Sequence, residues 1–207
     1  IGQYMDCPRA AVLRRLSLPK REEDFSRTLT LQRGHWFEDG VAQALLALHL
    51  PFVRQLEIAL NVDACPVRAH LDFVLASSAP RPTVRILEVK SMSHLPDSLY
   101  ASHEAQVYGQ IGLLARCWNL PAFNLKDETG TPVFSHLTFP QAAKVLWGMT
   151  LPDALSQVDV DAWVLALSMT NAKAFGPYRP NDAILNACLT SAQELWRKQE
   201  LGRQETL

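Results

Sequence analysis

Two carboxylates stand on either side of a predicted turn, and a lysine follows the second of them. Asp72 lies eight residues before Pro80, and Glu88 lies eight residues after it. If the flanking segments form an antiparallel hairpin centred on that turn, the two carboxylates face each other across the pair. Opposed carboxylates repel one another unless a cation lies between them. Their oxygens suit Mg²⁺ or Mn²⁺, which commonly bind one or two carboxylates together with water and phosphate oxygens.

The alternation of side chains along a strand predicts which residues share a face with these carboxylates. Glu88 and Lys90 are two positions apart and share one face, and the same alternation puts His70 beside Asp72. The opposite faces then carry the apolar residues Leu71, Phe73, Leu75, Leu87 and Val89. We therefore expect a polar site on one side of this hairpin and a packed core on the other.

Two predicted helices add further polar side chains. At helical spacing after Glu38 come Val41, Ala42, Leu45 and Leu46. Glu38 therefore lies on or beside an apolar stripe, where a carboxylate is costly unless it is paired or bound to a ligand. On the second helix one stripe contains His103, Gln106, Gln110 and Leu113. This stripe borders a site or, equally, forms a solvated helix edge.

The elements that would position these residues alternate between helices and strands. We expect helices from Pro8 to Pro19 and over 26–49, 98–118 and about 181–203, with helix also from about 140. We expect strands over 52–60, 67–76 and 83–90, and a strand pair within 121–139. This order predicts an α/β (or α+β) fold with a central mixed β-sheet flanked by helices. It further predicts a single domain over 1–207, with a core at about 26–139 and a helical C-terminal extension at about 140–207.

Composition excludes several classes of protein. The 207 residues include 20 lysines and arginines against 21 aspartates and glutamates, and 48% are hydrophobic. This balance excludes a strongly basic nucleic-acid binder and a disordered chain, and no apolar run suits a membrane span. The four scattered cysteines and the absence of a signal-peptide pattern predict a cytoplasmic protein with no membrane partner.

Taken in order, these residues resemble a known family. The set is Gly34-x-x-x-Glu38, Asp72, Glu88-Val89-Lys90, and Gln106 with Gln110. It resembles the PD-(D/E)XK nuclease superfamily, most closely its RecB-like and lambda-exonuclease-like branches, over about residues 33–113. Gln110 departs from the tyrosine often found there. The resemblance implies a restriction-endonuclease-like core and a metal-dependent deoxyribonuclease, specifically an exonuclease, that acts on single- or double-stranded DNA at its ends.

The same resemblance implies roles for individual residues. The implied ligands of a Mg²⁺ or Mn²⁺ ion are Asp72, Glu88, the backbone carbonyl of Val89, Glu38 and His70. His70 is alternatively a hydrogen-bonded structural residue. Lys90 would orient or deprotonate the attacking water, and Gln106 would position water or phosphate. A homo-oligomer, or a recombination or repair protein as partner, is compatible with this family.

The N-terminal residues carry a second resemblance. Tyr4-x-x-Cys7-Pro8-Arg9 is similar to the opening of RecB-like nucleases associated with CRISPR adaptation, which bind an iron–sulfur cluster through this cysteine and a C-terminal trio. Near the C-terminus this chain has Cys188 alone, so a four-cysteine set cannot be assembled there. We therefore expect no iron–sulfur cluster and a buried, packing role for Cys7.

Two other interpretations remain open at this stage. The chain could be a non-catalytic DNA-binding or assembly module on a nuclease-like fold. It could also be a plain α/β domain in which Glu88 and Lys90 form ion pairs with Asp72, although that leaves Glu38 on its apolar stripe unexplained.

Overall fold

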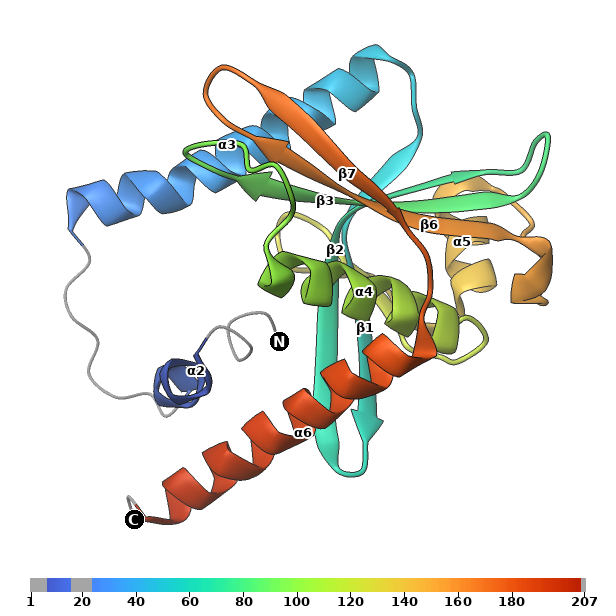
Figure 1. The fold of residues 1–207 in the computed structure, drawn as a ribbon. Helices are drawn as coiled ribbons and strands as arrows, with labels where there is room; N and C mark the ends of the chain where they lie inside the picture. Colours follow the sequence, from blue (N-terminus) through green and yellow to red (C-terminus); the bar gives the residue numbers. More distant parts are fainter. Residues whose placement is uncertain (1–6, 16–23, 206–207) are drawn as a thin grey trace.

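The structure, a computed structural model, describes residues 7–15 and 24–205. It is a mixed α/β fold with one seven-stranded sheet flanked by helices, which confirms the expected fold class (Figure 1). The strands are β1 (Phe52–Val62), β2 (Cys65–Ser77), β3 (Thr83–Ser91), β4 (Phe123–Lys126), β5 (Pro132–Leu137), β6 (Asp159–Leu167) and β7 (Ala172–Tyr178). The helices are α2 (Pro8–Arg15), α3 (Phe25–Ala47), α4 (Ala101–Arg116), α5 (Phe139–Trp147) and α6 (Asp182–Glu205), with a short 3₁₀ turn at Leu155–Gln157.

The strand order across the sheet is β5-β4-β1-β2-β3-β6-β7. All neighbouring pairs are antiparallel except β3 and β6, which are parallel. The β2–β3 hairpin pairs Phe73 with Leu87 and Ser77 with Thr83, so its register is centred on Pro80 as expected. Asp72 and Glu88 are therefore the next opposed positions, immediately beyond the last paired residues.

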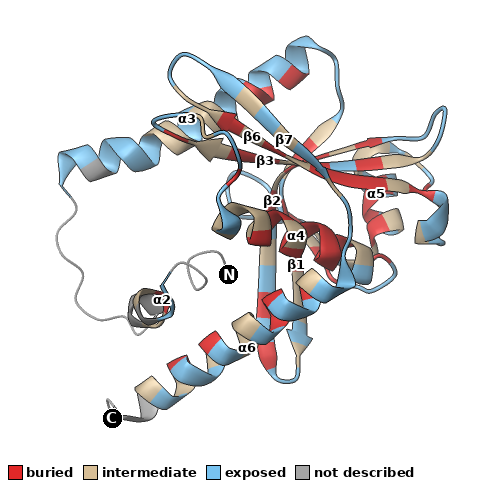
Figure 2. Ribbon diagram, in the orientation of Figure 1, coloured by how far each residue is buried: buried red, intermediate tan, exposed pale blue. Residues whose placement is uncertain are grey.

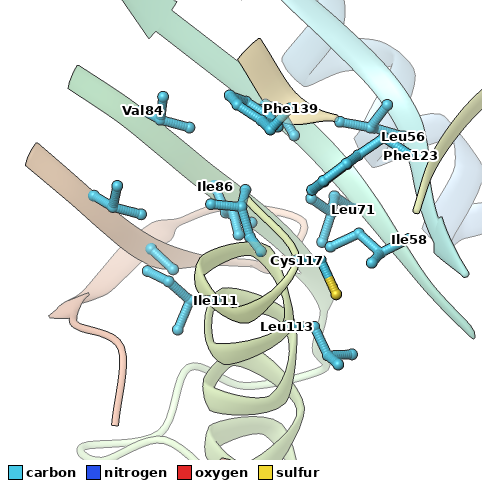
Figure 3. Close-up of a cluster of buried hydrophobic side chains, with 14 of the residues drawn as sticks. Leu56, Ile58, Leu71, Val84, Ile86, Ile111, Leu113, Cys117, Phe123 and Phe139 are labelled. Carbon is cyan, nitrogen blue, oxygen red and sulfur yellow. The ribbon is translucent and has the colours of Figure 1, made fainter. Parts of the chain in front are cut away.

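Helices pack on both faces of the sheet, and a separate hydrophobic core lies on each face. The larger core lies between the sheet and α4, α5 and α6, and it includes Leu71, Ile86, Ile111 and Phe139 (Figure 3). The smaller core lies under α3, where Val41, Ala42 and Leu45 contact Phe73 and Val89. The N-terminal half of α3 is mostly exposed (Figure 2).

The expected helical extension over about 140–207 is wrong, because two strands lie within it. β6 and β7 follow α5 and form one side of the sheet, with β6 directly beside β3. β6 reads DVDAWVLAL, and five of its nine residues are buried. A strand covered on both faces is apolar almost throughout, so it lacks the period-two alternation that distinguishes a strand from a helix.

Cys7 also differs from expectation, because it is exposed rather than packed in a core. The other three cysteines, Cys65, Cys117 and Cys188, are buried. Tyr4, the first residue of the N-terminal motif, lies outside the described residues. Within the described part of the chain, no helix combines the length and the apolar character needed to cross a membrane.

An ion pair between β3 and β6 gives a test of this sheet order. Arg85 lies opposite Asp161 and donates two hydrogen bonds to its carboxylate, at 2.6 and 2.8 Å. Asp161 is 3% exposed, whereas the Arg85 side chain is 48% exposed. We expect Arg85→Met to lower the free energy of unfolding by about 3 kcal/mol, because it leaves a buried carboxylate without its partner. Asp161→Asn should cost less, because water can solvate the freed guanidinium.

The neighbouring pair of Arg179 and Asp159 is the matched control. It joins β6 to the chain beyond β7, and both of its side chains are more exposed than that of Asp161. Arg179→Met should therefore cost less than about 1 kcal/mol. Urea denaturation measures the free energy of unfolding of the three variants. An Arg179→Met variant that is less stable than Arg85→Met would contradict the larger contribution of the buried Arg85–Asp161 pair.

Candidate active site

The end of the β2–β3 ladder brings the two predicted carboxylates together. Backbone pairing stops at Phe73 and Leu87. Beyond it the Val89 N–H donates to Asp72 Oδ2 at 2.9 Å, so a carboxylate replaces a backbone carbonyl as acceptor. Because the N–H and C=O of one strand residue point to the same neighbouring strand, the Val89 carbonyl is also directed toward the Asp72 side.

The alternation of side chains along β2 shifts by one residue at Asp72, so that the strand changes face there. This differs from the strict alternation that was expected. Leu71 belongs to the large core and Phe73 to the small one, although strict alternation puts both on one face. After the change, Val74 contributes to the large core. Asp72 therefore lies between the two cores rather than within either. Figure 1 shows the far half of the β1–β2 hairpin turning away from the rest of the sheet.

Strand β1 changes face at the same level, at Gln55. The residues on either side, Arg54 and Leu56, pair with Phe73 and Leu71, but Gln55 and Asp72 do not pair. Gln55 has a φ of 54°. This left-handed conformation costs a residue other than glycine about 1–2 kcal/mol. The sequence contains no signal for it, because glutamine is not among the residues that usually adopt it.

Glu88 is the most buried acid of the site, with 2% exposure. Its Oε1 accepts hydrogen bonds from Lys90 Nζ at 2.7 Å and from Gln106 Nε2 at 2.5 Å. Its Oε2 accepts from Gln110 Nε2 at 2.7 Å, and the same amide reaches the His70 carbonyl at 3.0 Å. The polar stripe of α4 thus faces the sheet and binds Glu88, which excludes the solvated-edge alternative for Gln106 and Gln110.

Lys90 is held by the same network. Its ammonium group also donates to Gln106 Oε1 at 2.9 Å, so Gln106 bonds both members of the Glu88–Lys90 pair. Lys90 neutralises Asp72 only in part, because its charge is the smallest of the influences on the pKa of Asp72. That pKa is raised from 3.8 to about 7, chiefly by burial and by the nearby charge of Glu88, with a smaller contribution from Glu38. The bond from Val89 and the charge of Lys90 oppose the rise. The site therefore disfavours the ionised form of Asp72, first through burial and then through the negative charge of its neighbours.

Glu38 reaches this site from α3 and lies near Asp72 through an intermediate side chain. Gln55 Nε2 lies 3.4 Å from Glu38 Oε2 and 3.5 Å from Asp72 Oδ1. Arg54 Nη2 approaches Glu38 at 3.8 Å and Nη1 binds Asp39 at 2.9 Å. Glu38 is thus paired on its apolar stripe, as the sequence argument required.

His70 is the predicted site residue that the structure does not bring to the carboxylates. Its imidazole lies 3.6 Å from Glu57, opposite it on β1. Val67 and Leu71 of β2 belong to the large core, so His70 between them points away from it. Glu88 follows Ile86 of the large core by two positions on β3 and therefore points toward it. His70 therefore contributes its backbone carbonyl, bound by Gln110, rather than its side chain.

The residues present fit a divalent metal with two protein carboxylates. Among the described residues, no three His, Cys, Asp or Glu side chains converge in the arrangement of a metal site. Mg²⁺ needs only one or two carboxylates when water and phosphate supply the other ligands. Glu88 accepts three hydrogen bonds, and a carboxylate has about four acceptor positions. Asp72, Glu88 and the Val89 carbonyl could therefore hold Mg²⁺ or Mn²⁺, which would favour the ionised form of Asp72.

Comparison with known proteins adds little to this geometry. No protein family model and no curated protein matches the chain. Among solved structures, the crystal structure of SSO0001 is similar with a TM-score of 0.47 and 8% sequence identity, over 91% of this chain and 86% of that one. The chemistry of the site must therefore be inferred from its own residues.

Proposed function

We propose that this chain is a metal-dependent deoxyribonuclease of the PD-(D/E)XK type, which hydrolyses phosphodiester bonds as an exonuclease. The observation that carries the proposal is the buried Glu88 carboxylate, bound to Lys90 and Gln106 and lying beside the Asp72 carboxylate. A packed core gains nothing from two neighbouring acids that repel each other. A divalent metal gives the arrangement a function.

Each residue has a definite part in the proposed reaction. Bound Mg²⁺ or Mn²⁺ would acidify a water molecule and neutralise charge on the phosphate. Asp72 and Glu88 hold the negative charge that retains the ion. Lys90, fixed by hydrogen bonds to Glu88 and Gln106, is available to orient or deprotonate the attacking water. Gln106 keeps the acid and the lysine at a fixed separation.

Cleavage of end-labelled linear DNA tests the proposal. We expect cleavage of single- or double-stranded DNA with Mg²⁺ or Mn²⁺ and none in EDTA, because the carboxylates cannot neutralise a phosphate without the ion. Covalently closed circular DNA is the matched control, because an exonuclease leaves it intact. The labelled products report the polarity of cleavage. The same assay with linear RNA reports whether the enzyme distinguishes deoxyribose from ribose.

A folded protein that cleaves none of these substrates with either metal would contradict the proposal. DNA binding without cleavage would instead favour the non-catalytic module.

All four cysteines are free, which supports a reducing compartment, and we infer a cytoplasmic location for the enzyme.

A further inference from the structure

Gln55 stands out because its backbone conformation and its side-chain contacts both lie beside Asp72. Its left-handed φ of 54° interrupts β1 directly opposite Asp72, where the β1–β2 ladder lacks a pair. Strain of this kind inside a strand persists where the surrounding structure requires it, and such positions cluster at functional sites. A glycine or asparagine would adopt the same backbone more readily.

The contacts of the side chain explain why this position has glutamine although other residues adopt its backbone conformation more readily. Its amide nitrogen lies 3.4 Å from Glu38 Oε2 and 3.5 Å from Asp72 Oδ1. It thereby connects an acid of α3 to an acid of β2 across the boundary between the two cores. Asp72 Oδ2 is already held by the Val89 N–H at 2.9 Å. The amide of Gln55 acts on the remaining oxygen, Oδ1, and so contributes to the orientation of the whole carboxylate.

We propose that Gln55 is a positioning residue for metal binding: its left-handed backbone lets Asp72 emerge between the cores, and its amide orients the Asp72 carboxylate against Glu38. This inference rests on the proposed nuclease function, because the carboxylate it orients is the proposed ligand. Gln55 would touch neither the metal nor the DNA. Groups that orient metal ligands in this way typically change metal affinity about 10- to 100-fold when they are removed.

Two substitutions separate the backbone role from the side-chain role. Gln55→Gly keeps the left-handed backbone and removes the amide, so we expect an unchanged or higher melting temperature together with about tenfold weaker Mn²⁺ binding. Gln55→Asn tolerates the same backbone and keeps a shorter amide, so it should recover part of the Mn²⁺ affinity. Calorimetric titration with Mn²⁺ and thermal unfolding measure both quantities without any DNA.

His49 provides the matched control. It also has a left-handed φ, of 53°, but it is exposed after α3 and outside the site. His49→Gly should leave both Mn²⁺ affinity and cleavage unchanged and raise the melting temperature, because the substitution relieves strain alone.

The outcomes distinguish failure of this inference from failure of the proposed function. If the wild-type protein binds Mn²⁺ and cleaves DNA, and Gln55→Gly does both equally well, Gln55 has no positioning role. If the wild-type protein binds Mn²⁺ but cleaves nothing, the nuclease proposal fails, while weaker Mn²⁺ binding by Gln55→Gly still supports the positioning role. If the wild-type protein binds no Mn²⁺, both fail.

Discussion

Replacement of Asp72 by asparagine is expected to reduce metal-dependent cleavage to about a thousandth or less and, in the absence of metal, to stabilise the protein. Activity falls because the variant loses an anionic ligand whose charge is needed to retain the ion and to act on the phosphate through it. Stability rises because the partial burial of Asp72 and the nearby charges of Glu88 and Glu38 disfavour its ionised form. Asparagine keeps an oxygen that can accept the Val89 N–H but carries no charge.

The stability change has a definite dependence on pH. The pKa of Asp72 is about 7 in the folded protein and near 3.8 in an ordinary environment. Between these values the unfolded chain has released a proton that the folded protein still holds, so the free energy of unfolding falls as pH rises. In EDTA, the advantage of Asp72→Asn in melting temperature should therefore be absent near pH 4, grow up to about pH 7, and then stay constant.

Thermal unfolding from pH 4 to pH 8, with EDTA or with Mn²⁺, checks this prediction. Mn²⁺ should raise the melting temperature of the wild-type protein more than that of the variant. Asp63→Asn is the control, because Asp63 is an exposed residue of the β1–β2 turn with a left-handed φ that asparagine tolerates. Retained cleavage by pure Asp72→Asn would refute the site assignment.

Local periodicity predicts part of this site from the sequence. Glu88 and Lys90 share a face because strand side chains have a period of two. The opposition of Asp72 and Glu88 follows from a turn centred on Pro80, which the pairing of Phe73 with Leu87 reproduces. The position of Gln106 and Gln110 on one stripe of α4 follows from helical spacing, but spacing alone left open whether that stripe faces a site or solvent.

The features that depend on tertiary structure were not predictable in this way. The change of face at Gln55 and Asp72 moves His70 away from the carboxylates, and no residue type in the sequence marks it. The bond from Gln110 to the His70 carbonyl joins residues 40 positions apart and uses a backbone group. β6 was misassigned because a strand buried on both faces has no alternation to detect.

Lys90→Met is expected to lower both stability and cleavage. Lys90 is the charged partner of Glu88, which would then remain buried with only the amides of Gln106 and Gln110 as donors. Removal of one member of such a pair costs about 3 kcal/mol of the free energy of unfolding. Cleavage should fall by about 10²–10⁴, the usual contribution of a group that orients or deprotonates a reacting water.

A second substitution separates these two effects. Glu88→Gln added to Lys90→Met removes both charges together, so the double variant should regain most of the lost stability, because no uncompensated charge remains buried. It should nevertheless stay inactive, since neither the proposed metal ligand nor the lysine is present. Lys144→Met on α5, an exposed lysine, should change neither quantity.

Lys90→Arg then distinguishes the two roles open to the lysine. Arginine keeps the positive charge but does not deprotonate in proteins, so it can stabilise an anionic phosphate but cannot accept a proton from water. Substantial cleavage by Lys90→Arg would assign Lys90 an electrostatic role, and its loss at unchanged stability would assign proton transfer. Full cleavage by Lys90→Met would exclude both, because the Glu88–Lys90 pair would then be structural alone, as in the plain α/β interpretation of the sequence.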